Sequence, residues 1–152
     1  MVLQNKNHNH KLFQSLIKMS HKGTSSDTSC KVALDTSMLL SIGELKLDVF
    51  EEISKKLGKT QFIVIEPVQK ELLKLSKQGK KLGLNAGIAD RLIRLNHAKI
   101  LKAREKNADK ALQKLSQKGV IIATNDRELR KNIQAKSGRI IFIKQKKFIE
   151  VE

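Results

Sequence analysis

The chain has 152 residues, with 31 Lys and Arg against 15 Asp and Glu, so its formal net charge is +16 at pH 7. This length suits one domain with a buried core; the single cysteine, Cys30, excludes an internal disulfide, and no apolar run approaches the length of a membrane span. The excess of positive charge favours a polyanionic partner, with nucleic acid or the ribosome ahead of an anionic membrane surface. We therefore expect a cytoplasmic protein that binds nucleic acid and not a membrane.

Residues 1–30 are polar and mixed in composition, and we predict that they form a basic, flexible arm outside a folded domain spanning residues 31–152. Three histidines, His8, His10 and His21, lie in this arm without further ligands beside them. A polar tail is therefore favoured over a metal site in this region.

Over the rest of the chain, short apolar runs alternate with helical patterns. Strands are expected at 31–35, 61–65, 120–123 and 139–143, with a short terminal strand at 147–151. Helices are expected over 37–57 as one or two segments closed by Gly58, from Pro67 onward, over 88–106, over 107–119 with Asn107 as the cap, and over 125–136. Between them, residues 79–87 are rich in Lys and Gly and predict a turn. Since helices separate unbroken apolar strands, the pattern predicts an α/β fold with a mainly parallel sheet covered on both faces.

Four acidic residues are expected near the edge where the parallel strands end. Asp35 ends the first strand, and Asp126 follows the third. Glu71 lies one turn into the helix after the second strand, and Asp109 lies in the first turn of the helix that begins at Asn107. Ligands of open α/β sheets bind beyond the carboxyl ends of the strands. In a strongly basic chain, acids at this edge predict a negative pocket suited to Mg²⁺ or Mn²⁺.

Each of these acids also has a simpler explanation. Asp126 and Asp109 would oppose the dipoles of the helices that they begin, and Asn125 with Glu128 three residues later resembles a capping box. Glu71 fits an exposed helix position. The metal site is therefore predicted from the combination and not from any one acid.

Four segments carry the acids: Asp35-Thr36-Ser37, Pro67-Val68-Gln69-Lys70-Glu71-Leu72, Ala108-Asp109-Lys110-Ala111-Leu112, and Val120-Ile121-Ile122-Ala123-Thr124-Asn125-Asp126 with Arg127-Glu128-Leu129. This set resembles the PIN-domain family of metal-dependent ribonucleases, over about residues 31–150. Within the family the chain looks most like archaeal PIN proteins that are similar to the nucleases of small-subunit ribosomal RNA processing, and also like VapC-type toxins. The resemblance implies a three-layer α/β/α sandwich in which Asp35, Glu71, Asp109 and Asp126 are the catalytic, metal-binding acids.

The resemblance further implies hydrolysis of RNA phosphodiester bonds with Mg²⁺ or Mn²⁺, in ribosomal RNA processing or ribosome biogenesis, with ribosomal RNA or a pre-ribosomal particle as partner. A VapC-type toxin with an antitoxin partner is a sub-case, and a homodimer stays open. The rival interpretation is a non-catalytic RNA-binding or ribosome-assembly factor on the same fold. Its best support is Lys110, which follows Asp109 where family members often carry a further acid.

Six residues beside the acids are candidates for binding the substrate: Thr36, Ser37, Thr124, Asn125, Arg127 and Arg130. The four without charge would orient the carboxylates or contact a phosphate, and hydrogen bonding at a strand end or helix cap is their simpler role. Arg127 and Arg130 follow Asp126 and would bind the RNA backbone. Such contacts position a strand without reading its sequence.

Overall fold

The computed structural model describes residues 29–152. Nearly all of the predicted arm, with its three histidines, lies outside the described residues, so the domain boundary at residue 30 stays a prediction. Within residues 29–152, no helix is both long enough and apolar enough to cross a membrane.

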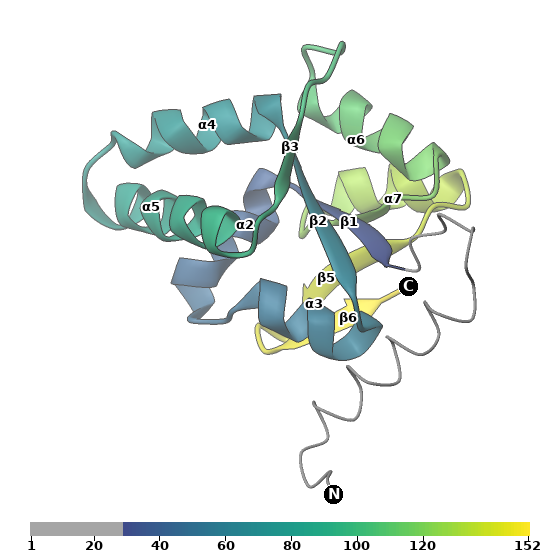
Figure 1. Cartoon of the computed structure of the whole chain (residues 1–152), viewed down its shortest axis with the longest axis horizontal. Helices are drawn as coiled ribbons and strands as arrows, with labels where there is room; N and C mark the ends of the chain where they lie inside the picture. The colour runs from purple at the N-terminus through teal and green to yellow at the C-terminus, as the bar shows by residue number, and fades with distance from the viewer. Residues whose placement is uncertain (1–28) are drawn as a thin grey trace, which may run out of the picture.

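In the described part of the chain, six strands form one sheet in the order β3-β2-β1-β4-β5-β6. Their bounds are Cys30–Leu34 (β1), Thr60–Ile65 (β2), Lys99–Leu101 (β3), Ile121–Ala123 (β4), Ile140–Lys144 (β5) and Phe148–Val151 (β6). The first five strands are parallel to their neighbours, and β6 returns antiparallel to β5 at one edge. The predicted α/β fold with a mainly parallel sheet is confirmed, and Figure 1 shows its arrangement.

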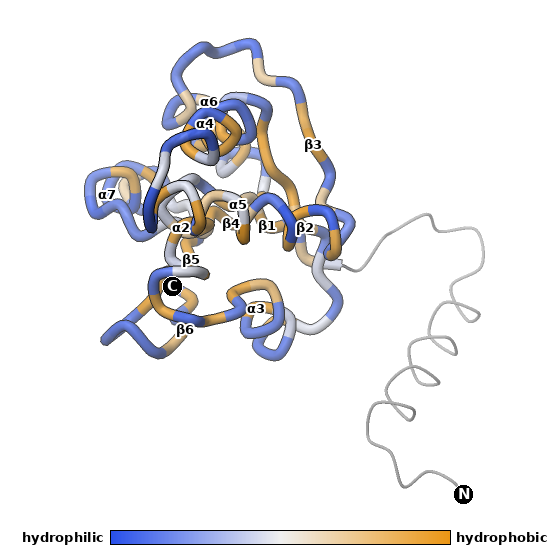
Figure 2. The backbone as a smooth tube through the Cα atoms, turned by 90° about the vertical axis from the view of Figure 1, so that its left-hand side faces the viewer, coloured by the Kyte–Doolittle hydropathy of each residue, from blue (hydrophilic) through white to orange (hydrophobic). Residues whose placement is uncertain are grey.

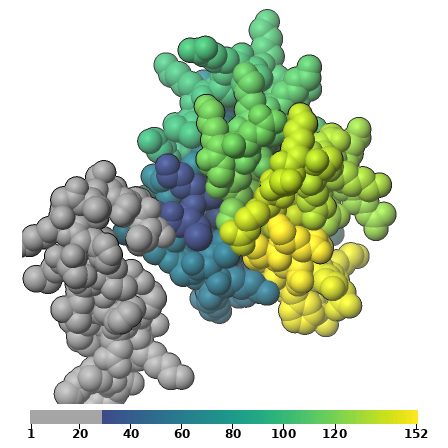
Figure 3. All heavy atoms as spheres, turned by 90° about the vertical axis from the view of Figure 1, so that its right-hand side faces the viewer, coloured from purple at the N-terminus to yellow at the C-terminus, as the bar shows by residue number. Residues whose placement is uncertain are grey.

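Six helices accompany the sheet within residues 29–152. They are Thr36–Leu45 (α2), Val49–Leu57 (α3), Glu66–Ser76 (α4), Lys80–Leu95 (α5), Ala108–Gln117 (α6) and Arg127–Ala135 (α7). Figure 2 places α4 and α6 on one side of the sheet and α3 on the other. Figure 3 shows that the segments from α6 onward, coloured green to yellow, form one continuous side of the molecule. Helices therefore cover both faces, as expected for a sandwich of three layers.

Local sequence signals fix several helix ends. Asn107 caps α6, because its side chain accepts hydrogen bonds from the backbone N–H groups of the first turn. Pro67 stands in the first turn of α4, where its missing N–H costs nothing. Gly58 closes α3 with a φ of 78°, a conformation that favours glycine. These three predictions are confirmed.

Two predictions between residues 79 and 106 are wrong. The supposed turn over 79–87 is the start of α5, and the supposed helix over 88–106 ends at Leu95 and is followed by β3. The glycines suggested a turn, yet Gly83 is buried with Ala86 and Ala89 on one face of α5, and at Gly83 the absence of a side chain leaves room for the backbone of Gln78. Strand β3 was missed because it is a short edge strand of only three residues, one exposed and two half-buried.

The start of α7 also differs from the prediction. The capping residue is Asp126 and not Asn125, so the predicted capping box of Asn125 and Glu128 is wrong. Asn125 is used elsewhere: its Oδ1 accepts a hydrogen bond of 3.0 Å from the Ile143 N–H. This bond ties the β4–α7 loop to β5.

The apolar core holds the ends of the central strands in place. Val32, Ala33 and Leu34 in β1 are fully buried, and Phe50 of α3 packs edge to face on Phe62 of β2 at a centroid distance of 4.8 Å. The hydrogen-bonded ladder continues just beyond the strand ends, where the Asp35 N–H donates to the Ala123 carbonyl at 3.0 Å. The residues that follow β1 and β4 are therefore set at a fixed position on the sheet edge.

Candidate functional site

A pocket of about 330 Å³ lies at the edge where the parallel strands end, and we name it the acidic pocket. Its lining comes from the N-terminal ends of α2, α6 and α7 together with α4: Asp35, Thr36, Ser37, Leu40, Val68, Glu71, Ala108, Asp109, Leu112 and Asp126. All four acids singled out in the sequence are among these residues. Although up to 91 positions apart in the sequence, they line one cavity.

Asp35 is the most constrained of the four acids, with only 7% of its surface exposed. Its Oδ1 accepts hydrogen bonds from the Ser37 hydroxyl at 2.7 Å and from the Met38 N–H at 2.9 Å, and its Oδ2 accepts one from the Thr124 hydroxyl. Burial raises the pKa of Asp35 above its ordinary value, and these hydrogen bonds oppose the rise. The carboxylate is therefore held in one orientation.

Thr124 joins Asp35 to Asp126. Its hydroxyl donates to Asp35 and accepts from the Asp126 N–H at 3.0 Å, while the Asn125 N–H donates to the Ser37 hydroxyl at 3.1 Å. Thr124 has no exposed surface, so in this structure it supports the carboxylates and is not available to a phosphate. Ser37 and the Asn125 backbone make the same kind of supporting contact between the ends of β1 and β4.

Asp126 and Glu71 are exposed, and hydrogen bonds hold one carboxylate oxygen of each. The Oδ1 of Asp126 caps α7 by accepting from the N–H groups of Glu128 at 2.9 Å and Leu129 at 3.2 Å. The Thr36 hydroxyl donates to Glu71 Oε2 at 2.7 Å, which ties the start of α2 to α4. The helix-capping role that the sequence suggested for Asp126 is thus present alongside its place in the pocket.

Asp109 lies at the rim, where it experiences the charges of the other acids. The pKa of Asp109 is raised above its ordinary value, mainly by desolvation and next by the negative charge of Asp126. Glu128 and Glu71 act in the same direction. Glu128 is an acid whose effect on the site was missed in the sequence, where it was assigned only to helix capping; its place two residues after Asp126 was the signal available.

The donor set of the acidic pocket fits a hard divalent cation in its chemistry. The pocket offers four carboxylates and no histidine or cysteine, which matches the oxygen ligands that Mg²⁺ and Mn²⁺ prefer. As the side chains stand, no three His, Cys, Asp or Glu residues within 29–152 converge closely enough to hold a metal ion. Asp35 is fixed, so rotation of the exposed acids, Glu71 and Asp109 above all, is what would complete a set of ligands.

The two arginines predicted to bind RNA lie outside the lining of the acidic pocket. Arg127 is exposed at the first position of α7, directly after Asp126. Arg130 lies one turn further on, and its guanidinium carbon sits 4.3 Å from the centroid of the Phe142 ring, a cation–π contact. Arg127 is therefore the freer of the two to meet a strand at the pocket.

Replacement of Thr124 by Val is expected to lower the free energy of unfolding by about 1–3 kcal/mol, because the buried Asp35 carboxylate and the Asp126 N–H each lose a hydrogen-bond partner. Urea unfolding of the purified variant measures this. Thr60→Val is the matched control, since the Thr60 hydroxyl bonds only the carbonyl of exposed Gly58; a change within about 0.5 kcal/mol is expected there. Equal losses in both variants would contradict the bridging role of Thr124.

Two ribonucleases have sequences similar to this chain. Ribonuclease VapC4 of Methanocaldococcus jannaschii is 28% identical over 129 residues, which are 80% of this chain and 95% of that protein. Ribonuclease VapC9 of Archaeoglobus fulgidus is 26% identical over 133 residues, which are 86% of this chain and 95% of that protein.

Two solved structures have a similar fold. The PIN domain endonuclease Utp24 is 26% identical, with a TM-score of 0.67 over 80% of this chain and 90% of that one. A domain of a functionally unknown protein from Methanocaldococcus jannaschii is 18% identical, with a TM-score of 0.56 over 76% and 92% of the two chains, and shows likeness of fold alone.

A family model described as a PIN-like domain matches residues 32–146, a stretch that contains all four acids of the pocket and most of the sheet. The match agrees with the resemblance drawn from the segments around Asp35 and Asp126, and with the similarity to VapC ribonucleases and the Utp24 endonuclease. The chain belongs to the PIN-like domain family.

Proposed function

We propose that the protein is a Mg²⁺- or Mn²⁺-dependent endoribonuclease, in which Asp35, Glu71, Asp109 and Asp126 form the metal-binding, catalytic site. The observation that carries this proposal is the gathering of these four carboxylates in one pocket at the strand ends of a chain whose net charge is +16. Membership of the PIN-like family and the similarity to two proteins named ribonucleases support it.

In this proposal two acids of the pocket are fixed ligands and two are exposed ligands whose side chains can rotate. Asp35, held by three hydrogen bonds, and Asp126, held as the cap of α7, keep their carboxylates in place as the inner ligands. Glu71 and Asp109, both exposed, complete the set directly or through water. When bound, a divalent cation activates a water for attack on the phosphodiester and neutralises the charge that develops on the phosphate.

The substrate must be brought to a negative pocket, and the rest of the chain supplies the attraction. With 31 Lys and Arg residues, the protein draws polyanions by long-range attraction, and Arg127 stands beside Asp126 to contact the backbone. We propose ribosomal RNA or a pre-ribosomal particle as the partner, and RNA processing during ribosome biogenesis as the role. The proposal rests on this charge and on the resemblance of the sequence.

A VapC-type toxin is a sub-case of the same chemistry, supported by the two VapC relatives. It requires an antitoxin partner, so a small reading frame beside the gene and co-purification of its product would distinguish it.

A non-catalytic RNA-binding or ribosome-assembly factor is the second candidate. Lys110 places a positive charge next to Asp109, and no three acids within residues 29–152 converge as the side chains stand. On this alternative the protein binds RNA without cutting it.

The deciding experiment is an RNA cleavage assay with the purified full chain. Labelled single-stranded and ribosomal RNA are incubated with millimolar Mn²⁺ or Mg²⁺, and in parallel with EDTA. We expect internal cleavage with the metals, none with EDTA, and recovery when excess Mn²⁺ is returned. Salt-sensitive RNA binding without cleavage under any of these conditions would favour the non-catalytic factor.

A further inference from the structure

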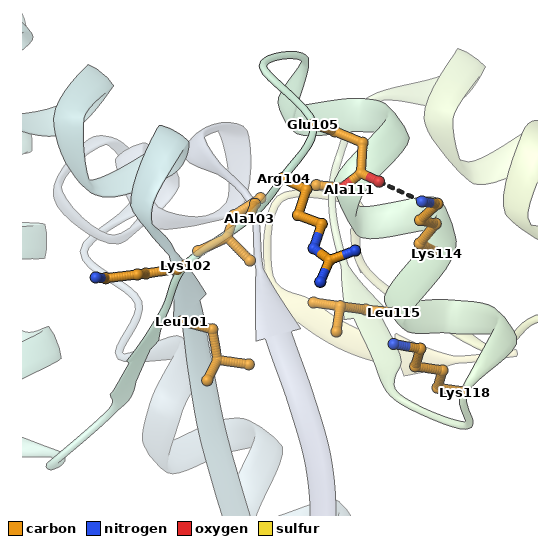
Figure 4. Close-up of a pocket in the computed structure, with 10 residues that line it drawn as sticks. Leu101, Lys102, Ala103, Arg104, Glu105, Ala111, Lys114, Leu115 and Lys118 are labelled. Atoms are coloured by element: carbon orange, nitrogen blue, oxygen red, sulfur yellow. Dashed lines mark ion pairs between the residues drawn. The ribbon is translucent and has the colours of Figure 1, made fainter.

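A second pocket, of about 420 Å³, lies on another face of α6, and we name it the basic pocket (Figure 4). It is lined by Ile65 and Leu101 at the ends of β2 and β3, by the segment after β3, and by α6: Ile65, Leu101, Lys102, Ala103, Arg104, Glu105, Ala111, Lys114, Leu115 and Lys118. Its volume falls within the range of about 300–1,000 Å³ typical of small-ligand sites. None of its charged residues was a candidate for binding RNA in the sequence analysis.

The positive charges of the basic pocket are not all neutralised by the protein. Glu105 is the acid among the lining residues, and its carboxylate is bound by Lys114 at 2.5 Å. Figure 4 shows the guanidinium of Arg104 directed into the pocket and the amine of Lys118 turned toward it, while Lys102 points away. Within the described residues neither Arg104 nor Lys118 forms a salt bridge. Two convergent cations are therefore available to an anion.

The floor between these cations is apolar. Ile65, Leu101 and Leu115 contribute aliphatic side chains to the lining. A pocket that pairs unneutralised cations with an apolar floor suits a ligand in which an anionic group is joined to a flat, less polar part, as in one nucleotide of a nucleic acid. The planar guanidinium of Arg104 can bind phosphate through two hydrogen bonds, and Lys118 adds a point charge.

The two pockets are neighbours because they share α6. Ala108, Asp109 and Leu112 line the acidic pocket, whereas Ala111, Lys114 and Leu115 line the basic pocket on another face of the helix. A helix with its side chains is only about 10–12 Å across, so the two pockets are within reach of one short stretch of a strand. A strand crossing α6 would therefore present one phosphate to the acidic pocket and another, a few nucleotides away, to the basic pocket.

We propose that the basic pocket is a subsite for the RNA strand, in which Arg104 and Lys118 bind one backbone phosphate and the apolar floor receives the attached nucleoside. The inference rests on the proposed function, because it assumes that the acidic pocket binds an RNA strand. It adds a second point of attachment, on the side of α6 away from the acids.

The test compares two double variants that remove the same charge. Arg104→Gln with Lys118→Gln empties the basic pocket of its unpaired cations. Lys56→Gln with Arg139→Gln is the control: both residues are exposed, one in the last turn of α3 and the other just before β5, and neither lines the acidic or the basic pocket. Thermal unfolding first establishes that both variants are folded. Binding of a short single-stranded RNA to the full chain is then measured by fluorescence anisotropy in EDTA, over a series of salt concentrations.

We expect the pocket variant to bind RNA about tenfold more weakly than the wild type, with a slope of log Kd on log salt reduced by about 0.7 for one lost phosphate contact. The control variant should change by less than about twofold. Equal weakening of the two variants would overturn the subsite, because it would mean that only overall charge matters. A poly-glutamate peptide is the second probe: loss of its binding in the pocket variant, with RNA binding unchanged, would also overturn the proposal and indicate an acidic protein partner.

Failure of the subsite can be told apart from failure of the proposed function, because binding is measured without divalent metal. A wild-type protein that cleaves RNA, with both double variants binding equally, removes the subsite and leaves the nuclease. A wild-type protein that never cleaves, but loses RNA in the pocket variant alone, keeps the subsite and removes the nuclease.

Discussion

Replacement of Asp126 by Asn is expected to lower the rate of RNA cleavage by about 10²–10³-fold while the fold is retained. An Asn oxygen still accepts from the N–H groups of Glu128 and Leu129, so α7 keeps its cap. What is lost is the negative charge that a divalent cation requires. Asp35→Asn should behave alike, because the amide has the shape of the carboxylate and the Thr124 hydroxyl can accept from it.

Asp48 provides a matched control for this experiment. It caps α3 by accepting from the Glu51 N–H at 3.1 Å, as Asp126 caps α7, but it does not line the acidic pocket. Asp48→Asn should therefore cut RNA at the wild-type rate. Single-turnover cleavage with Mn²⁺ measures the rates, and calorimetric titration with Mn²⁺ measures binding of the metal. Full cleavage activity in both Asp35→Asn and Asp126→Asn would contradict the proposed site. An equally large loss of activity in Asp48→Asn would contradict it as well.

Two glycines one helical turn apart in α5 are expected to respond to alanine with opposite signs. A Cβ at Gly83 would lie 1.8 Å from the carbonyl oxygen of Gln78, a backbone group in the short turn between α4 and α5, so this turn would have to shift. Gly83→Ala should therefore lose about 1–3 kcal/mol of unfolding free energy through overpacking. A Cβ at Gly87 meets nothing within 4 Å, so Gly87→Ala should gain about 1 kcal/mol from helix propensity.

Thermal unfolding followed by circular dichroism distinguishes these outcomes. In a domain of this size, 1 kcal/mol corresponds to a change in Tm of about 2–4 °C. We expect the Tm to fall in Gly83→Ala and to rise in Gly87→Ala, each compared with the wild type. A rise in both variants would show that the turn before α5 does not approach Gly83 as closely as the structure has it.

The buried strands and the acids at their ends could be predicted from the sequence, because local residue patterns encode them. Apolar runs such as Val32 to Leu34 identify the buried strands, and the rule that ligands bind beyond the strand ends drew attention to Asp35 and Asp126. The pattern gave wrong answers where tertiary packing overrides composition. Gly83 occurs inside a helix because close packing requires it, and β3 depends on pairing with β2 at residues too few and too exposed to signal a strand.

The contacts that shape the site could not be predicted from local sequence. Thr124 supports Asp35 across 89 positions, and Ser37 meets the Asn125 backbone across 88. Asp126 and not Asn125 caps α7, and the Asn125 side chain instead accepts a hydrogen bond from the Ile143 N–H. Likewise, Arg104 and Lys118 converge only because the segment after β3 lies against α6.

The place of β1 in the sheet also sets the moment at which the acidic pocket comes into existence. β1 emerges from the ribosome before β4, yet it pairs with β4, and Asp35 accepts a hydrogen bond from Thr124. At about 5–20 residues per second, the stretch from Asp35 to Thr124, a sequence separation of 89, takes several seconds to synthesise. During that interval the nascent chain contains Asp35 without the Thr124 hydroxyl that holds its second carboxylate oxygen. The ribosome that makes this protein is therefore not exposed to a formed acidic pocket until Thr124 and Asp126 have been synthesised.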